Sequence, residues 1–214
     1  MRRLPIYLLL DTSGSMSGEP IEAVKNGVKT LHSALRKEPQ AMEIAYISII
    51  TFDSDVRQVV PLTELMNFTP PNLNAGGGTS LGEALDLLVK CAGREVVKTT
   101  PQAKGDWKPL VFLMTDGMPT DDVNRALPAF KAYKWGVVVA CAAGGQADTL
   151  VLQNIAGENV IKLATCDTKS IAAYFKYVST SIAVSSKRLD AGGQEIGNIS
   201  ELPPPPPEIS LLKF

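Results

Sequence analysis

The chain has 214 residues, enough for one α/β domain with a substantial core, and its 45% hydrophobic and 20% charged residues are typical of a globular protein. Its 21 Lys and Arg residues balance 22 Asp and Glu residues, which gives a formal net charge of −1. Nucleic acids and anionic membranes both require a clustered positive surface, so this balance argues against either as a partner.

The beginning of the sequence superficially resembles a signal peptide, because Arg2 and Arg3 precede the apolar run of residues 4–10. That run is short, Asp11 ends it, and no small-residue cleavage site follows. No stretch of the sequence approaches the roughly 20 apolar residues of a membrane span. We therefore expect neither a leader nor a membrane-spanning helix.

The cysteines and the histidine indicate which cellular compartment the protein occupies and which kinds of catalytic or metal site it can contain. Cys91, Cys141 and Cys166 are widely spaced within apolar patterns, which predicts thiols in a reducing compartment rather than a disulfide framework. We therefore expect a cytoplasmic protein. The only histidine is His32, in a helical pattern, so a Ser-His-Asp or Cys-His hydrolase would have to recruit it. A zinc site built from several histidines is excluded because the sequence contains only one.

Apolar residues alternate between strand-like and helix-like runs, which predicts a doubly wound sheet. Residues 4–10 are a continuous apolar run, as expected of a strand covered on both faces. A helix is expected at residues 20–37, where Pro20 suits the first turn. A second strand at residues 44–52 turns tightly into a third at residues 56–62. This hairpin makes the third strand an antiparallel edge.

A loop rich in Pro, Asn and Gly then leads to residues 80–97, where helical spacing resumes. The remaining elements alternate in chain order: a strand at 110–115, a helix at 121–134, a strand at 137–142, a helix at 149–156, a strand at 160–163 and a helix at 171–187. We therefore predict a three-layer, Rossmann-like α/β domain over residues 1–188. Its mostly parallel, six-stranded sheet has one antiparallel edge strand.

The composition changes after Arg188, and we expect residues 189–214 to form a Gly- and Pro-rich tail outside the domain. Five consecutive prolines predict a stiff polyproline II rod of roughly 15 Å; they are Pro203, Pro204, Pro205, Pro206 and Pro207. The rod would project the apolar chain end, up to Phe214, towards a groove on a second copy or on a partner. A disordered appendage is the alternative.

Three polar motifs interrupt the apolar pattern. Two of them follow predicted strands: Asp11-Thr12-Ser13-Gly14-Ser15 and Thr115-Asp116-Gly117. The third, Gly76-Gly77-Gly78-Thr79-Ser80, precedes a predicted helix. In a doubly wound sheet the ligand crevice lies outside the carboxyl ends of the strands, where the strand order reverses. If the strands at 4–10 and 110–115 are neighbours there, Asp11 and Asp116 lie side by side.

These motifs supply only oxygen ligands: the carboxylates of Asp11 and Asp116 and the hydroxyls of Ser13, Ser15 and Thr79. Such a set suits a hard cation such as Mg²⁺, with Mn²⁺ or Ca²⁺ as alternatives. Each motif also has a simpler explanation when taken alone. The serines can cap a helix, Asp-Gly is a common turn, and a glycine triplet can be a flexible connector.

The segments LLLDTSGSM, GGGTSLGEAL and FLMTDGMPTD resemble the three parts of the metal-ion-dependent adhesion site (MIDAS) of von Willebrand factor A (vWA) domains. The resemblance covers about residues 4–187, and no position departs from the family pattern. It implies that the metal site consists of Asp11, Ser13, Ser15, Thr79 and Asp116. It also implies a non-enzymatic module in which an acidic side chain of a protein partner completes the coordination of the metal.

The start of the chain, MRRLPIYLLLDTSGSMSGEPIEAVKNGV, further resembles the TerY-type group of bacterial proteins associated with tellurite-resistance gene clusters. This resemblance implies a scaffold in a tellurite or chemical stress response. The partners that it implies are a protein kinase and a PP2C-type phosphatase.

Two alternatives remain open at this stage. The first is a Mg²⁺-assisted phosphoryl-transfer or hydrolytic enzyme in the same crevice, with Asp121 or Glu19 as a general base. Against it, the sequence has neither a P-loop pattern nor a lysine beside the glycine triplet. The second concerns Trp107, which precedes a strand and therefore lies at the end of the sheet opposite the metal. It either fills the base of the domain or forms a second contact surface.

Overall fold

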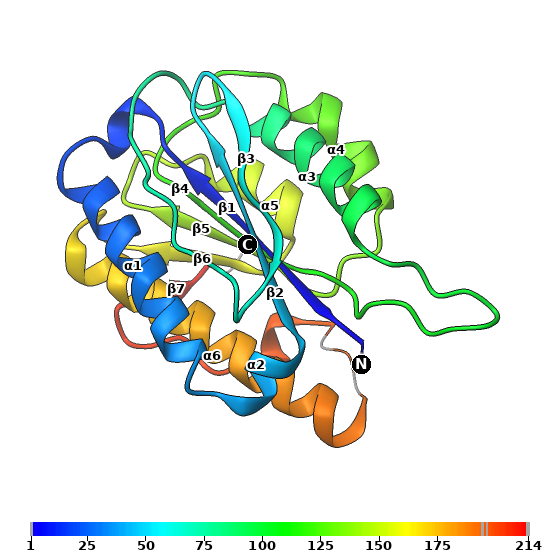
Figure 1. The fold of residues 1–214 in the computed structure, drawn as a ribbon. Helices are drawn as coiled ribbons and strands as arrows, with labels where there is room; N and C mark the ends of the chain where they lie inside the picture. The colour runs from blue at the N-terminus through cyan, green and yellow to red at the C-terminus, as the bar shows by residue number, and fades with distance from the viewer. Residues whose placement is uncertain (1, 194, 196, 213–214) are drawn as a thin grey trace.

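The structure is a computed structural model that describes residues 2–193, 195 and 197–212. These residues form one seven-stranded sheet with helices on both faces (Figure 1). The strands, in chain order, are β1 (Leu4–Asp11), β2 (Ala45–Phe52), β3 (Val56–Glu64), β4 (Leu110–Thr115), β5 (Val138–Ala143), β6 (Val160–Leu163) and β7 (Ile209–Leu211). Their spatial order is β3-β2-β1-β4-β5-β6-β7, and the two edge strands are antiparallel to their neighbours.

Two layers of helices cover the sheet (Figure 1). The helices are α1 (Glu19–Leu35), α2 (Pro39–Ile44), α3 (Leu81–Glu95), α4 (Val123–Ala132), α5 (Thr149–Ala156) and α6 (Thr168–Gly192), with single 3-10 turns η1 (Gly14–Met16) and η2 (Ile199–Glu201). Helices α1, α2 and α6 pack on one face and enclose one apolar core. Helices α3, α4 and α5 pack on the other face and enclose a second core.

Strand β1 lies at the centre of the sheet, and alternate side chains enter the two cores. Ile6 and Leu8 join the core under α1 and α6, whereas Tyr7 and Leu9 join the core under α3 and α4. A strand buried on both faces has no polar face, which explains the continuous apolar run in the sequence.

Helices α1 and α6 approach each other very closely because α1 has a glycine at the contact. A Cβ at position 27 would overlap the ring of Phe175, which is itself 1% exposed. This contact seats α6 on the same face of the sheet as α1. The end of β6 and the start of α6 are thereby brought to the same edge of the molecule as the start of α1.

The predicted fold class is confirmed. The β2–β3 hairpin makes β3 an antiparallel edge, as expected. Three details differ from the prediction. The short helix α2 lies before β2, where no element was predicted, helix α6 is longer at both ends, and the sheet has a seventh strand. Strand β7 has only three residues, too few for a recognisable alternation of apolar and polar positions.

The expectation that the segment after residue 188 lies outside the domain is wrong for the described residues. Helix α6 continues to Gly192, and β7 pairs with β6 in antiparallel register. Leu202 and Ile209 are only 6% and 5% exposed, because they pack into the core under α1 and α6. Burial of these apolar side chains favours a docked segment over a projecting one.

The five prolines from Pro203 to Pro207 therefore connect η2 to β7 rather than project the chain end from the body, and three of them are half-buried. Their role in binding a partner stays a prediction. Phe214, the other predicted contact of the tail, lies outside the described residues. None of the helices in the described part of the chain is long and apolar enough to cross a membrane.

Candidate metal site

The candidate site lies at the carboxyl ends of β1 and β4, where the strand order of the sheet reverses. The two strands are parallel neighbours, and Leu10 pairs with Met114 in their register. Consequently Asp11, at the end of β1, and Asp116, just after β4, leave the sheet at the same edge. The juxtaposition expected from the sequence is therefore present, at the kind of position where doubly wound sheets bind ligands.

Asp11 is almost completely buried, with 1% of its surface exposed. Its Oδ1 accepts a hydrogen bond from the backbone N–H of Ser13 at 2.8 Å, and its Oδ2 accepts one from the hydroxyl of Thr115. Burial raises the pKa of Asp11, hydrogen bonds from Ser13 and Thr115 lower it, and the neighbouring Asp116 carboxylate raises it further. The balance is a raised pKa, and no basic side chain among the described residues forms an ion pair with Asp11.

The two serines of the first motif link Asp11 to Asp116. Ser13 Oγ and Ser15 Oγ lie 3.0 Å apart, and Ser15 Oγ donates a hydrogen bond to Asp116 Oδ1 at 2.7 Å. Helix capping was the simpler explanation for these serines. Neither caps a helix with its side chain: the N-cap of η1 is Ser13, without a side-chain hydrogen bond, and the N-cap of α1 is Gly18.

Thr79 reaches the same place from the loop before α3. A Cβ at position 117 would lie 3.6 Å from Thr79 Oγ1 and 3.8 Å from Ser15 Oγ, so both hydroxyls face the glycine that follows Asp116. Thr79 is held in place by Thr120, whose hydroxyl accepts from the backbone N–H of Thr79 at 2.9 Å. The structure thus brings together all five predicted residues: Asp11, Ser13, Ser15, Thr79 and Asp116.

Residues after β2, for which the sequence predicts only a hairpin turn, also hold the site together. Asp53 Oδ2 accepts a hydrogen bond from the hydroxyl of Thr12 at 3.0 Å, and Ser54 Oγ accepts one from the backbone N–H of Gly78 at 2.8 Å. Gly77 has a φ of +75°, and a side chain there would meet Ser54 Oγ. The glycine triplet is therefore a tightly packed loop rather than a flexible connector.

The role of Asp53 and Ser54 could have been inferred from the sequence through their position directly after β2. Strand β2 is parallel to β1 and adjacent to it, so the residues after β2 must lie beside the residues after β1. The hydroxyl of Thr115, which stands next to Asp116 in the third motif, was likewise not assigned a role from the sequence. Its position opposite Asp11 follows only from the pairing of β1 with β4.

The donor set fits a hard divalent cation. Mg²⁺ binds oxygen at about 2.1 Å in an octahedron, which places neighbouring ligand oxygens about 3.0 Å apart. The two serine hydroxyls already have this separation. The described residues contain no cluster of three or more His, Cys, Asp and Glu side chains suited to a metal. A cation at this site would therefore be bound by two carboxylates together with hydroxyl groups. The two negative charges would at most neutralise the charge of a divalent ion.

One thiol lies close to this site. Burial raises the pKa of Cys166 to about 12, and the carboxylates of Asp116 and Asp11 contribute to the shift. Its Sγ lies 4.0 Å from Met16 Sδ. The cysteine lies between β6 and α6. With so high a pKa the thiol stays protonated at neutral pH and is a poor nucleophile.

Comparison with protein families agrees with this architecture. A family model described as "von Willebrand factor type A domain" matches residues 6–172. Among curated proteins, the chain is 32% identical over 123 residues to the uncharacterized protein sll0103 of Synechocystis sp.. The match covers 54% of this chain and 26% of that protein, so the chain spans about a quarter of the length of this relative.

Solved structures show the same fold. Proximal thread matrix protein 1 of the mussel byssus, solved with a zinc-occupied MIDAS motif, superposes with a TM-score of 0.62 at 21% identity, over 85% of this chain and 48% of that chain. The pilus adhesin SpaC of Lactobacillus rhamnosus GG gives a TM-score of 0.67 at 17% identity, over 86% and 31% of the two chains. At these identities the likeness shows the fold alone.

Proposed function

This chain belongs to the von Willebrand factor type A domain family, and we propose that it is a non-enzymatic, metal-dependent protein-binding module. The metal is a divalent cation, Mg²⁺ in preference to Mn²⁺ or Ca²⁺. It is held by Ser13, Ser15 and Thr79, with Asp11 and Asp116 as direct or water-mediated ligands. An Asp or Glu side chain of a partner protein completes the coordination.

The observation that carries this proposal is the convergence of three loops on one point with an oxygen-only donor set. Ser13 Oγ, Ser15 Oγ and Asp116 Oδ1 form a continuous chain of contacts of 3.0 and 2.7 Å. A bound cation would offset the free-energy cost of burying Asp11 next to a second carboxylate. When bound, it supplies a positive centre that favours an anionic ligand.

The geometry favours binding over the enzymatic alternative, because both candidate general bases have other partners. Asp121 accepts hydrogen bonds from the backbone N–H groups of Gly82 and Glu83 at 3.0 and 2.8 Å. Glu19 accepts hydrogen bonds from the N–H and hydroxyl of Thr168 at 3.0 and 2.7 Å. Each carboxylate stabilises a helix or joins two helices instead of standing ready to accept a proton from a substrate.

The finer part of the proposal is a scaffold in a bacterial tellurite or chemical stress response, with a protein kinase and a PP2C-type phosphatase as partners. Its support is the resemblance of the first 28 residues to TerY-type proteins. A cytoplasmic location is also proposed. It rests on the free thiols of Cys91, Cys141 and Cys166, which suit a reducing compartment.

The metal is tested by calorimetric titration of the full chain with Mg²⁺. Thr79→Ala removes a hydroxyl that faces the site and is expected to weaken Mg²⁺ binding by about tenfold or more. Thr63→Ala is the matched control, since its hydroxyl donates to the carbonyl of Pro61 in β3, away from the site. Equal Mg²⁺ affinities for the wild type and Thr79→Ala would reject the assignment of the site.

The partner is tested by binding the purified kinase and phosphatase to the chain in Mg²⁺ and then in EDTA. We expect EDTA and Thr79→Ala each to abolish the complex, while the circular dichroism of the chain is unchanged. A complex that survives EDTA would show that the partner binds away from the metal.

A further inference from the structure

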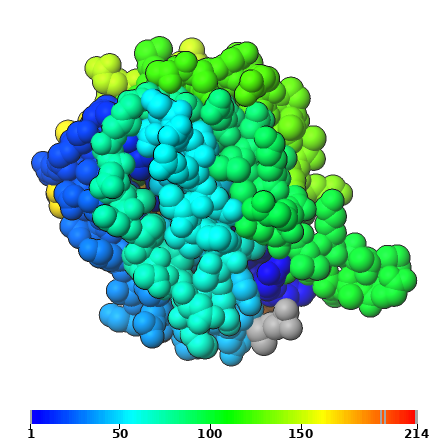
Figure 2. Space-filling view, turned by 45° about the horizontal axis from the view of Figure 1, so that its top comes forward, coloured from blue at the N-terminus to red at the C-terminus, as the bar shows by residue number. Residues whose placement is uncertain are grey.

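A groove of about 540 Å³ lies at the end of the sheet opposite the metal site. Its lining comes from the N-terminal segment, the base of the loop between α3 and β4, and the residues after α4. Arg2 precedes β1 and Trp107 precedes β4, whereas Asp11 and Asp116 lie at or beyond the far ends of these strands. The loop itself projects from the body of the molecule in Figures 1 and 2, where it is the green segment near residue 100.

The base of this loop is tightly constructed. Asp106, whose side chain is 5% exposed, accepts hydrogen bonds from Arg3 Nε at 2.9 Å, from Arg3 Nη2 at 2.6 Å and from the backbone N–H of Val97 at 2.7 Å. A Cβ at position 105 would overlap the carbonyl oxygen of Val97, so the two sides of the loop approach closely only because residue 105 is glycine. The groove is therefore preformed.

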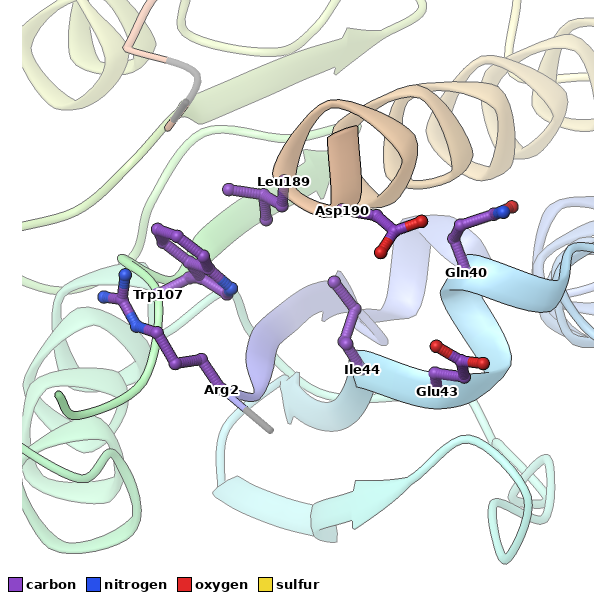
Figure 3. Close-up of a pocket in the computed structure, with 7 residues that line it drawn as sticks. All are labelled: Arg2, Gln40, Glu43, Ile44, Trp107, Leu189 and Asp190. Atoms are coloured by element: carbon purple, nitrogen blue, oxygen red, sulfur yellow. The ribbon is translucent and has the colours of Figure 1, made fainter. Parts of the chain in front are cut away.

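Apolar and aromatic groups form one wall of the groove. The guanidinium of Arg2 stacks over the Trp107 ring, with its carbon 3.4 Å from the ring centroid, and Arg2 Nε also donates to the carbonyl of Gly105 at 2.7 Å. Figure 3 shows this stacked pair from the side of a neighbouring hollow. Val97 is 56% exposed at the groove. An exposed apolar side chain beside a half-buried tryptophan is a suitable contact for an apolar side chain of a ligand.

The charges of the groove are unbalanced. Its two acidic residues are both paired: Asp106 with Arg3, and Glu195 with Lys108 Nζ at 2.8 Å. Two further lysines, Lys98 and Lys134, line the groove, and no carboxylate among the described residues lies within ion-pair distance of either. The uncompensated charge is therefore positive, on a chain whose net charge is −1.

We propose that this basic groove, lined by Arg2, Val97, Lys98, Trp107 and Lys134, is a second protein-binding site that takes an acidic peptide segment with an apolar side chain. The carboxylates of the peptide pair with Lys98 and Lys134, and its apolar side chain packs against Val97 and Trp107. Charge complementarity supplies specificity and a fast association rate, and the apolar contact supplies affinity. Binding at this end requires no metal.

The neighbouring hollow limits where such a peptide lies. It has a volume of about 170 Å³, shares Arg2 and Trp107 with the basic groove, and is lined on its other side by Glu43 and Asp190 (Figure 3). These carboxylates repel an acidic peptide, so the Arg2–Trp107 pair marks one boundary of the site. Glu43 accordingly offers a charge change just outside the basic groove.

The test uses fluorescein-labelled synthetic peptides and the full chain in EDTA, with fluorescence anisotropy as the measurement. One peptide alternates Glu and Leu, a second alternates Lys and Leu, and a third alternates Glu and Ser. We expect only the Glu/Leu peptide to bind well, with an affinity that falls as salt is raised. The double variant Lys98→Glu, Lys134→Glu is expected to weaken this binding by about tenfold or more.

Two variants serve as controls. Lys29→Glu, on the exposed face of α1, makes the charge change of one of these two substitutions at a site away from the groove, and it should leave the affinity unchanged. Glu43→Gln should leave it unchanged or strengthen it slightly. Equal binding of the Lys/Leu peptide, or full binding by the double lysine variant, would overturn the proposal. Failure of the Glu/Leu peptide to bind, or its loss in EDTA relative to Mg²⁺, would do so as well.

Discussion

At the scale of single residues, the candidate site is defined by a buried acid, Asp11, that forms no ion pair within the described part of the chain. Burial and the nearby Asp116 raise the pKa of Asp11, although two hydrogen bonds favour its charged form. An acid whose pKa is higher in the folded state destabilises the fold as the pH rises above its ordinary value in the unfolded chain, about 4. In the metal-free protein, the ionised side chain therefore lowers stability at neutral pH.

This argument predicts opposite effects of Asp11→Asn on stability and on metal binding. Asparagine keeps one oxygen, which can accept from the backbone N–H of Ser13, and its amide group can donate to the hydroxyl of Thr115, but it carries no charge. In EDTA the variant should be at least as stable as the wild type, and its advantage should grow as the pH rises above about 4. Thermal unfolding in EDTA and in Mg²⁺ measures both effects.

In Mg²⁺ the order should reverse. An ion present at about 100 times its Kd stabilises the wild type by about 2.7 kcal/mol, and the variant should gain almost nothing. Asp86→Asn is a suitable control because Asp86 pairs with Arg125 on the helix surface, 3.4 Å away. An undiminished Mg²⁺ response in Asp11→Asn would show that Asp11 does not hold the ion.

At the scale of elements, the seating of α6 on α1 depends on Gly27. The ring of Phe175 occupies the space of a Cβ at this position, and both helices are closely packed there. Overfilling a packed core forces side chains or backbone to shift, which costs about 1–3 kcal/mol. The residue is therefore glycine for reasons of packing, in spite of its poor helix propensity.

We expect Gly27→Ala to lower the free energy of unfolding by about 1–3 kcal/mol. Gly93→Ala is the matched substitution in α3, where the added Cβ would meet no other described group within 4 Å beyond the helix's own nearby backbone. That variant should be more stable by about 0.5–1 kcal/mol, because alanine favours the helix. Urea unfolding of the two variants measures both changes. Similar free energies for the two would contradict a close contact between α1 and α6.

At the scale of the whole molecule, the C-terminal segment belongs to the folded unit. Ile209 is buried against the core under α1 and α6, whereas Leu211, two residues along the same strand, is 41% exposed. Ile209→Ala should therefore lower the free energy of unfolding by about 2 kcal/mol or more. Leu211→Ala should change it by less than about 1 kcal/mol. Urea unfolding measures both changes. Equally small losses of unfolding free energy in the two variants would mean that β7 does not stabilise the domain.

The two proposed binding sites lie at opposite ends of the sheet. The metal site lies where β1 and β4 end, and the basic groove lies where they begin. A parallel sheet between two helix layers separates these ends by the length of its strands. One partner that presents a carboxylate to the metal and another that presents an acidic peptide to the groove would not compete for space.

Local patterns in the sequence determined most of the fold and pointed to the five residues of the candidate metal site. Strands buried on both faces must be continuously apolar, and helices on a sheet must repeat apolar positions at 3.6-residue spacing, so both are readable without knowing their neighbours. The position of Asp11 and Asp116 relative to their strands was also a local fact, because each follows an apolar run directly.

Only the tertiary structure decided what depends on contacts between distant segments. Asp53, Ser54 and Thr115 became parts of the site because β2 and β4 flank β1. Strand β7 is part of the sheet because it pairs with the outer edge of β6 and because Ile209 packs into the core. The basic groove exists because Arg3 holds Asp106, about a hundred residues away, and so brings Lys98 to the same surface as Lys134. No local pattern specifies such pairings, since each is the outcome of how the whole chain packs.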